Sequence, residues 1–278
     1  VRGCSCRGTA GFVHVSCLAE QAKILVTEAE ENNLDAKALN AKLDRWHTCG
    51  LCEQRHHGVV SCALGWACWK TYLGRPVADQ IRLVAINVLG LGLNDTRQHA
   101  DALSVGEAEL STLRRIDAPE YDILVAQGNL ANTYKRLGRP EHALRMKRDV
   151  YYGNVKILGE EDESTFVTAA NYANSLLELR HFEEAKAVLR KMMPVARRVL
   201  GDSDDTTLRM RSMYAVALSR DTGSSLDDRR EAVTTLEETA RTARRVLGDA
   251  NPLAAHIEHA LRDARAMLAA PGLVALAL

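Results

Sequence analysis

A pattern of residues returns along the chain at an interval of 42 positions. The hexapeptide NLANTY at 129–134 reappears as NYANSL at 171–176, and Ala131, Ala173 and Ala215 keep the same interval. Self-similarity at a fixed period of about 20–50 residues is typical of stacked arrays, because a single unit cannot bury its apolar face alone. The chain is therefore predicted to stack its units into a solenoid.

Each unit is predicted to consist of two helices. In the unit that starts near residue 120, apolar residues recur at helical spacing through the first half. Gly138 then interrupts the pattern, and Pro140 suits the first turn of a second helix, which Gly159 ends. Aromatic residues make up only 5% of the chain and Ala and Leu dominate, which favours helix over sheet. The first apolar stripe consists of Ile123, Leu130, Ala131, Tyr134 and Leu137, and the second includes Ala143, Leu144, Val150 and Tyr151.

The motifs of these units resemble the tetratricopeptide repeat, in the longer form found in kinesin light chains. The resemblance rests on Gly-Arg-x-Glu-x-Ala at 138–143 and on Phe-Glu-Glu-Ala at 182–185. It covers residues 83–254 as about four units, and residues 255–278 are predicted to form a capping helix and a tail. Leu-Gly pairs close successive units at 158–159, 200–201 and 247–248, the last interval being five residues longer within the loop DTGSSLDD.

The resemblance also implies a binding surface. In tetratricopeptide arrays the first helices line a concave groove, so Asn129, Asn132, Asn171 and Asn174 are expected on that face, where amide groups can clamp the backbone of a ligand. The expected ligand is a protein or a peptide. The arginines and lysines between 135 and 148 either line the same groove or form a solvated face.

The seven cysteines all lie among the first 68 residues. The spacings in Cys4-x-Cys6 and Cys49-x-x-Cys52 let two thiolates enter one tetrahedral zinc site, whereas an odd number of cysteines fits a disulfide framework less well. Free thiols imply a reducing compartment, so the chain is predicted to be intracellular and cytoplasmic. The candidate zinc ligands are Cys4, Cys6, His14, Cys17, Cys49 and Cys52.

The cysteine-rich segment resembles the RING-CH, or RING-variant, zinc finger. The match is CSCRGTAGFVHVSCL at 4–18, followed by WHTCGLC at 46–52. The family carries eight ligands in two interleaved sites, so the resemblance implies that the chain begins inside the domain. It assigns residues 1–58 to a partial finger and 59–82 to a linking helix. By the same pattern, Cys4, Cys6, Cys49 and Cys52 form one complete site, and His14 and Cys17 are half of the other.

Two features depart from the finger pattern. The segment 18–48 is long, and its centre, ILVTEAEENNLDAKALNAKL, is predicted to form extra helix. Ubiquitin-ligase members commonly carry a Trp four residues after the sixth ligand, facing the ubiquitin-conjugating enzyme, and here that position holds Gln21. Trp46 is predicted to pack near the second cysteine pair instead. Of the residues left over, Cys62 and Cys68 are predicted to be buried on a helix, and His56 and His57 to be exposed or hydrogen-bonded at the surface.

Charge and composition exclude several functions. Lys+Arg and Asp+Glu are both 36, and the resulting net charge of zero removes the usual electrostatic basis for binding nucleic acid. No apolar run reaches the roughly 20 residues that span a bilayer. The glycine-rich GLGLN at 90–94 lacks the Lys of a phosphate-binding loop, and no catalytic nucleophile is recognisable.

The sequence therefore predicts a mainly α chain, a tetratricopeptide helical solenoid preceded by a small zinc-binding RING-variant module. Two functions remain open. One is a ubiquitin-ligase adaptor, which holds a substrate on its repeats and a ubiquitin-conjugating enzyme on its finger, and which catalyses by proximity alone. The other is a zinc-binding scaffold without transfer activity.

Overall fold

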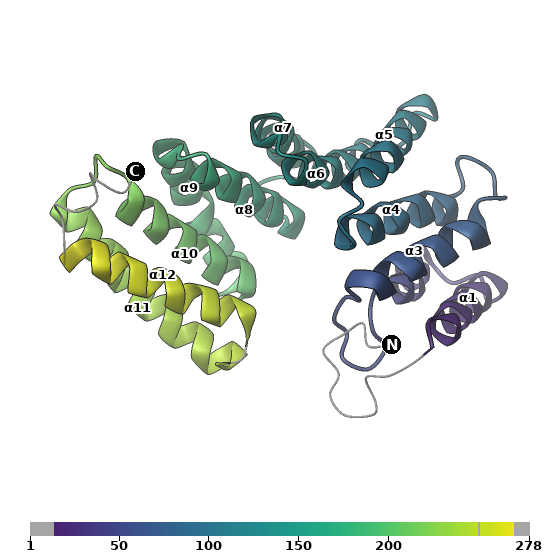
Figure 1. The fold of residues 1–278 in the computed structure, drawn as a ribbon, viewed down its shortest axis with the longest axis horizontal. Coiled ribbons are helices and arrows are strands. Elements are labelled where there is room, and N and C mark those ends of the chain that lie inside the picture. The colour runs from purple at the N-terminus through teal and green to yellow at the C-terminus, as the bar shows by residue number, and fades with distance from the viewer. Residues whose placement is uncertain (1–13, 250, 270–278) are drawn as a thin grey trace. The chain divides into compact units, whose positions relative to one another are not determined.

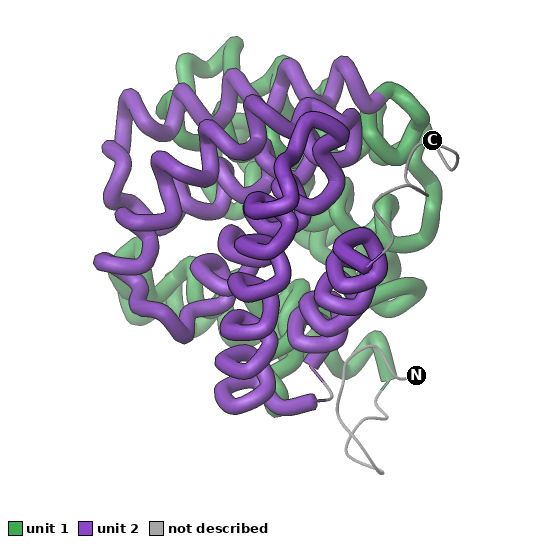
Figure 2. Tube along the Cα trace, turned by 90° about the vertical axis from the view of Figure 1, so that its left-hand side faces the viewer, with its two compact units in different colours: residues 1–139 green, residues 140–278 purple. Residues whose placement is uncertain are grey.

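The chain folds into helices that divide between two compact units, residues 1–139 and 140–278 (Figure 2). The computed structural model describes residues 14–249 and 251–269, and in those ranges every regular element is a helix. The predicted mainly α fold is confirmed for these residues. Unit 1 holds α1 (Val15–Glu31), α2 (Ala36–Leu43), the 3-10 helix η2 (Asp44–Trp46), α3 (Gly58–Tyr72), α4 (Gln80–Asp95), α5 (His99–Arg115) and α6 (Glu120–Arg136). Unit 2 holds α7 (Pro140–Leu158), α8 (Glu163–Glu178), α9 (Phe182–Leu200), α10 (Asp205–Arg220), α11 (Leu226–Leu247) and α12 (Pro252–Ala269).

The helices of unit 2 pack in the order in which they follow one another (Figure 1). Each helix from α7 to α12 contacts the next, and α10 also contacts both α8 and α12. The helices α8, α10 and α12 thus share one layer, and α9 and α11 alternate with them along the chain. None of the described helices is long and apolar enough to cross a membrane.

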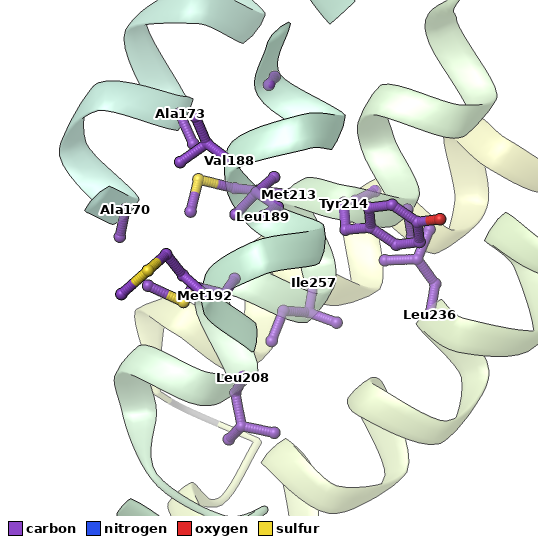
Figure 3. Packing of buried hydrophobic residues seen from close by; sticks show 14 of the residues in the cluster. Ala170, Ala173, Val188, Leu189, Met192, Leu208, Met213, Tyr214, Leu236 and Ile257 are labelled. Atoms are coloured by element: carbon purple, nitrogen blue, oxygen red, sulfur yellow. The ribbon is translucent and has the colours of Figure 1, made fainter. Parts of the chain in front are cut away.

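Small residues at fixed repeat positions bring these helices together. Ala173 and Ala215, one interval apart on α8 and α10, are both fully buried, as are Ala185 on α9 and Ala232 on α11. Larger side chains fill the space between them, among them Leu189, Met192, Leu236 and Ile257 (Figure 3). The periodic alanines predicted from the sequence are therefore core residues of the array.

The repeated Leu-Gly pairs mark the ends of helices. α7, α9 and α11 each end at the Leu of a pair, and the glycines that follow have φ angles of +88°, +92° and +81°. Glycine adopts this left-handed conformation without steric cost. Asp162 and Asp204, again 42 positions apart, then cap the next helices by accepting hydrogen bonds from backbone N–H groups. The acidic segment GEEDES at 159–164 thus leads into α8, which begins at Glu163.

Trp46 joins the N-terminal segment to the first long helices of unit 1. Its side chain is 1% exposed and meets the ring of Tyr72 on α3 edge to face, with ring centroids 5.8 Å apart. Val26 of α1 and Val88 of α4 belong to the same apolar cluster. Trp46 was predicted to pack near the second cysteine pair, and the structure shows it packed against α3. The predicted extra helix between 18 and 48 is present as parts of α1 and α2.

α3 and α4 approach each other closely because glycine lies at their contact. A Cβ atom on Gly92 would lie 2.7 Å from the carbonyl oxygen of Ser61 and 2.8 Å from the Cα of Cys62. A Cβ on Gly65 would lie 3.0 Å from the Cα of Leu89. These neighbours are backbone atoms, which cannot rotate away. Gly92 of the GLGLN segment therefore serves helix packing.

We predict that Gly92→Ala lowers the free energy of unfolding by about 1–3 kcal/mol or more, because the added methyl group forces α3 and α4 apart. Gly74→Ala is the matched control, since nothing lies within 4 Å of a Cβ at that exposed turn. Urea denaturation followed by circular dichroism compares the two variants. Equal stability of both would contradict the close contact.

Candidate functional site

The second cysteine pair lies in a tight hairpin that spans residues 47–56. The Cys49 sulfur accepts a hydrogen bond from the Leu51 N–H at 3.4 Å, and Glu53, directly after Cys52, has a φ of +56°. Thr48 and Arg55 pair as an isolated antiparallel bridge, the only one among the described residues. The Cys49 sulfur is thus held in place by the backbone of its own turn.

Hydrogen bonds within the hairpin, and one from the 3-10 helix η2 before it, fix its backbone. The His56 N–H donates to the His47 carbonyl oxygen at 2.7 Å, and the Arg45 guanidinium donates to the Cys49 carbonyl oxygen at 3.3 Å. Cys49 is buried, Cys52 is half-buried, and Leu51 at the tip is 74% exposed. The backbone around the two thiols is thus ordered by its own hydrogen bonds.

The other histidine–cysteine pair lies at the start of α1. His14 is the N-cap residue, and the Cys17 N–H donates to its carbonyl oxygen at 3.1 Å. Both side chains are exposed. Gln21, the residue at the position of the ligase Trp, is exposed on the same helix.

The remaining predicted ligands, Cys4 and Cys6, lie outside the described residues. Within residues 14–249 and 251–269, no group of three or more His, Cys, Asp or Glu side chains is arranged to hold a metal ion. The zinc site thus stays a prediction, for which the structure describes two separate pairs of ligands. The leftover residues Cys62 and Cys68 are buried on α3 as predicted, with His57 exposed and His56 buried.

In unit 1, polar side chains gather between α4, α5 and α6. The Asn94 amide donates to the Thr133 hydroxyl at 2.8 Å, and the Asn87 amide donates to a carboxylate oxygen of Glu109 at 3.1 Å. These side chains line a small cavity, and Asn129 of α6 lines it too. These contacts occupy Asn87 and Asn94 within the protein, whereas Asn132, further along α6, is exposed.

In unit 2, the repeat asparagines lie on α8. Asn171 is half-buried, and the Asn174 amide donates to a Glu178 carboxylate oxygen at 2.9 Å. The two residues are one helical turn apart, so both reach the same face of α8. Asn129 and Asn132 therefore lie on α6, and Asn171 and Asn174 lie on α8. α6 and α8 are the first helices of their 42-residue repeats, and the two asparagines on α8 are partly open to a ligand.

Glu109 is a buried acid that the sequence pattern did not reveal. Its side chain is 7% exposed in the middle of α5, and burial raises the pKa of its carboxyl group to about 7, although the hydrogen bond from Asn87 opposes the shift. The sequence of α5 alone does not show that Glu109 is buried, because its hydrogen-bond partner Asn87 comes from α4.

Comparison with known proteins identifies the repeats. Residues 123–163 and 165–205 match the tetratricopeptide-repeat family. These two segments carry the tetratricopeptide-repeat pattern. These two matches coincide with α6–α7 and α8–α9, the helix pairs in which the 42-residue interval is clearest.

Solved structures show a similar fold. A kinesin-light-chain-like protein of Podosopora anserina, with nearly identical TPR-like repeats, is 17% identical with a TM-score of 0.55, over 84% of this chain and 98% of that one. A Rap protein complexed with Competence and Sporulation Factor is 14% identical with a TM-score of 0.54, over 90% of this chain and 65% of that one. No protein with curated annotation matches the chain. At these identities the likeness establishes the fold alone.

We predict that Glu109→Gln makes unit 1 less sensitive to pH. Because the native carboxyl group holds its proton up to about pH 7 and the unfolded one releases it near 4.5, the native state gains stability as the pH falls through this window and loses it as the pH rises. Gln keeps the acceptor for Asn87 without a charge. The variant should be more stable than the parent at about pH 8, by about 1–3 kcal/mol, and should show a flatter profile.

Urea denaturation of the full chain at both ends of this pH window measures the effect. Glu107→Gln is the control, because Glu107 lies two residues away on the exposed side of α5 and accepts a hydrogen bond from Tyr134. A profile for Glu109→Gln that matches the parent would show that the buried carboxyl group does not titrate in this range.

Proposed function

We propose that this chain is a zinc-containing protein-interaction protein, which holds a protein or peptide ligand on its tetratricopeptide repeats. The observation that carries the proposal is the polar face of α8 in unit 2, where Asn171 and Asn174 are both half-buried. An amide side chain both donates and accepts hydrogen bonds, so it can pair with the backbone of an extended ligand whatever the ligand's sequence. The similar fold of the Rap protein that binds Competence and Sporulation Factor supports this use of the helices.

We predict that Asn171→Ala combined with Asn174→Ala weakens partner binding by about tenfold or more, because each lost hydrogen bond contributes about 0.5–1.5 kcal/mol. Neither residue belongs to the apolar core of unit 2, so the melting temperature should change little. The control is Arg241→Ala, an exposed position on α11, outside the layer of first helices. Photo-crosslinking from position 171 and from position 241, followed by mass spectrometry, identifies the partner and its face. The same crosslinked proteins from both positions would contradict binding on the first helices.

The N-terminal part of the proposal is a zinc site. The hairpin around Cys49 and Cys52 fits such a site, because a backbone N–H already points at one sulfur and the left-handed residue after Cys52 closes the turn. Cys4 and Cys6 would supply the other two thiolates, which completes a tetrahedral structural set. His14 and Cys17 offer two more ligands from the start of α1.

We predict that the purified chain holds one zinc ion that resists mild chelation, and that Cys49→Ser releases it. Zinc binding to four thiolates is coupled to folding, because the unfolded chain does not gather them. The variant should therefore loosen residues 1–52 while unit 2, which contains no cysteine, stays folded. Cys62→Ser is the control, since Cys62 is buried on α3 away from the predicted set.

Elemental analysis before and after chelation decides between the outcomes. A folded N-terminal segment without zinc would overturn the metal assignment. Two chelator-resistant zinc ions would show that the set of Cys4, Cys6, Cys49 and Cys52 is incomplete.

Two versions of this function differ in whether the N-terminal module engages a ubiquitin-conjugating enzyme. The resemblance of residues 4–18 to the RING-CH finger supports the ligase version, in which the protein positions a substrate beside the conjugating enzyme. Gln21, exposed on α1 where ligases commonly carry Trp, supports a scaffold without transfer activity. Accelerated discharge of ubiquitin from a conjugating enzyme by the purified chain separates the two.

A further inference from the structure

Unit 2 contains a cavity of about 810 Å³ that the repeat pattern did not predict. It lies at the carboxyl ends of α8 and α10, beside the start of α9, and Met267 of α12 closes one wall. Neither Asn171 nor Asn174 lines the cavity, but the two surfaces adjoin, because the Asn174 amide donates to Glu178, which does line it. Its size suits several neighbouring side chains of a ligand.

The lining has an apolar part and a charged part. Leu177, Phe182 and Met267 are all half-buried and present hydrocarbon to the cavity. An apolar side chain placed against them would leave water, which is favourable in proportion to the area buried. The charged groups stand around these three residues, so a ligand that fits must combine apolar and polar contacts.

Carboxylates outnumber cations around the cavity. Four carboxylates line it, against the guanidinium groups of Arg180 and Arg220 and the imidazole of His181. α8 and α10 also direct their carboxyl ends there, and each end carries a partial negative charge. Counting Lys186, which pairs with two of these carboxylates, the carboxylates still outnumber the Lys and Arg side chains by four to three. Two helix carboxyl ends also face the cavity against the single N-terminus of α9, so the balance favours a cation in the bound ligand. The carboxylates are those of Glu178, Glu183, Glu184 and Asp221.

Hydrogen bonds within unit 2 hold these carboxylates in place. Lys186, whose side chain is 7% exposed, contacts Glu183 at 2.6 Å and Asp221 at 2.7 Å. Glu184 accepts a hydrogen bond from the hydroxyl of the buried Tyr172. Groups fixed before binding lose little conformational freedom when a ligand arrives, so the arrangement is pre-organised.

We propose that this cavity binds a basic, apolar segment of the partner protein, with a Lys or Arg beside Glu178 and Glu184 and a neighbouring apolar side chain on Leu177, Phe182 and Met267. The inference rests on the proposed protein-binding function and adds the chemical class of the ligand. Asn171 and Asn174 on α8 would hydrogen-bond to the ligand's backbone, which all peptides share. The cavity would select among ligands by their side chains.

A phage-displayed library of random dodecapeptides, selected on the full chain, tests the charge preference. We expect the enriched peptides to carry Lys or Arg next to an apolar residue. The double variant Glu178→Gln, Glu184→Gln keeps the hydrogen-bond acceptors for Asn174 and Tyr172 but removes two charges. Fluorescence anisotropy with the most enriched labelled peptide should show a loss of affinity of about tenfold or more in this variant. Arg180→Gln, which removes a positive charge from the lining, should have the opposite effect and strengthen binding.

The outcomes separate this proposal from the proposed function. Enriched peptides that are acidic, or that bind the double variant as well as the parent, would overturn the basic ligand. If such peptides still lose affinity when Asn171 and Asn174 become Ala, the protein-binding function stands and only the cavity assignment fails. Failure to enrich any peptide over an unrelated protein would also overturn the proposal, whereas photo-crosslinking at position 171 tests the function independently. Circular dichroism melting of each variant checks that unit 2 stays folded.

Discussion

Close contact between helix backbones, made possible by residues with little or no side chain, is the constraint on which the structure depends. In unit 1 the contact is at Gly92, where no Cβ fits between α4 and the backbone of α3. In unit 2 it is made by alanines such as Ala173 and Ala215, which are fully buried at equivalent positions of successive repeats. Because these residues have small side chains, neighbouring helices leave little space between them, and Leu, Met and Ile side chains fill it. The polar faces of the helices are left to point outward.

Much of this fold could be predicted, because the information lies in residues close together in the sequence. The end of α7 at Leu158 and its start at Pro140 follow from single residues with fixed backbone preferences. The position of Trp46 could not be predicted in the same way. Its partner Tyr72 lies 26 residues away on α3, and only the tertiary packing of unit 1 decides that the indole turns toward this ring.

For the candidate sites too, local features could be predicted from the sequence and features built by several helices could not. The hairpin at Cys49 is local, so its spacing predicted a metal-binding turn, and the structure supplies the backbone geometry of that turn. Asn171 and Asn174 were predicted from the interval, and the structure places them on one face of α8. The cavity of unit 2 depends on four helices and the surroundings of the buried acid Glu109 on three, and nothing in the local pattern marks them. Cys4 and Cys6 remain a prediction.

All the thiols of the chain lie before residue 69, and this has a practical consequence for labelling. Two of the described thiols, Cys62 and Cys68, are enclosed on α3, which slows their alkylation. A cysteine introduced on α11 would be the sole thiol of unit 2, so a maleimide dye would report on that unit alone once accessible thiols of unit 1, such as Cys17, are replaced. Distances within the repeat layer, and their change when a partner arrives, thereby become accessible to fluorescence with few background substitutions.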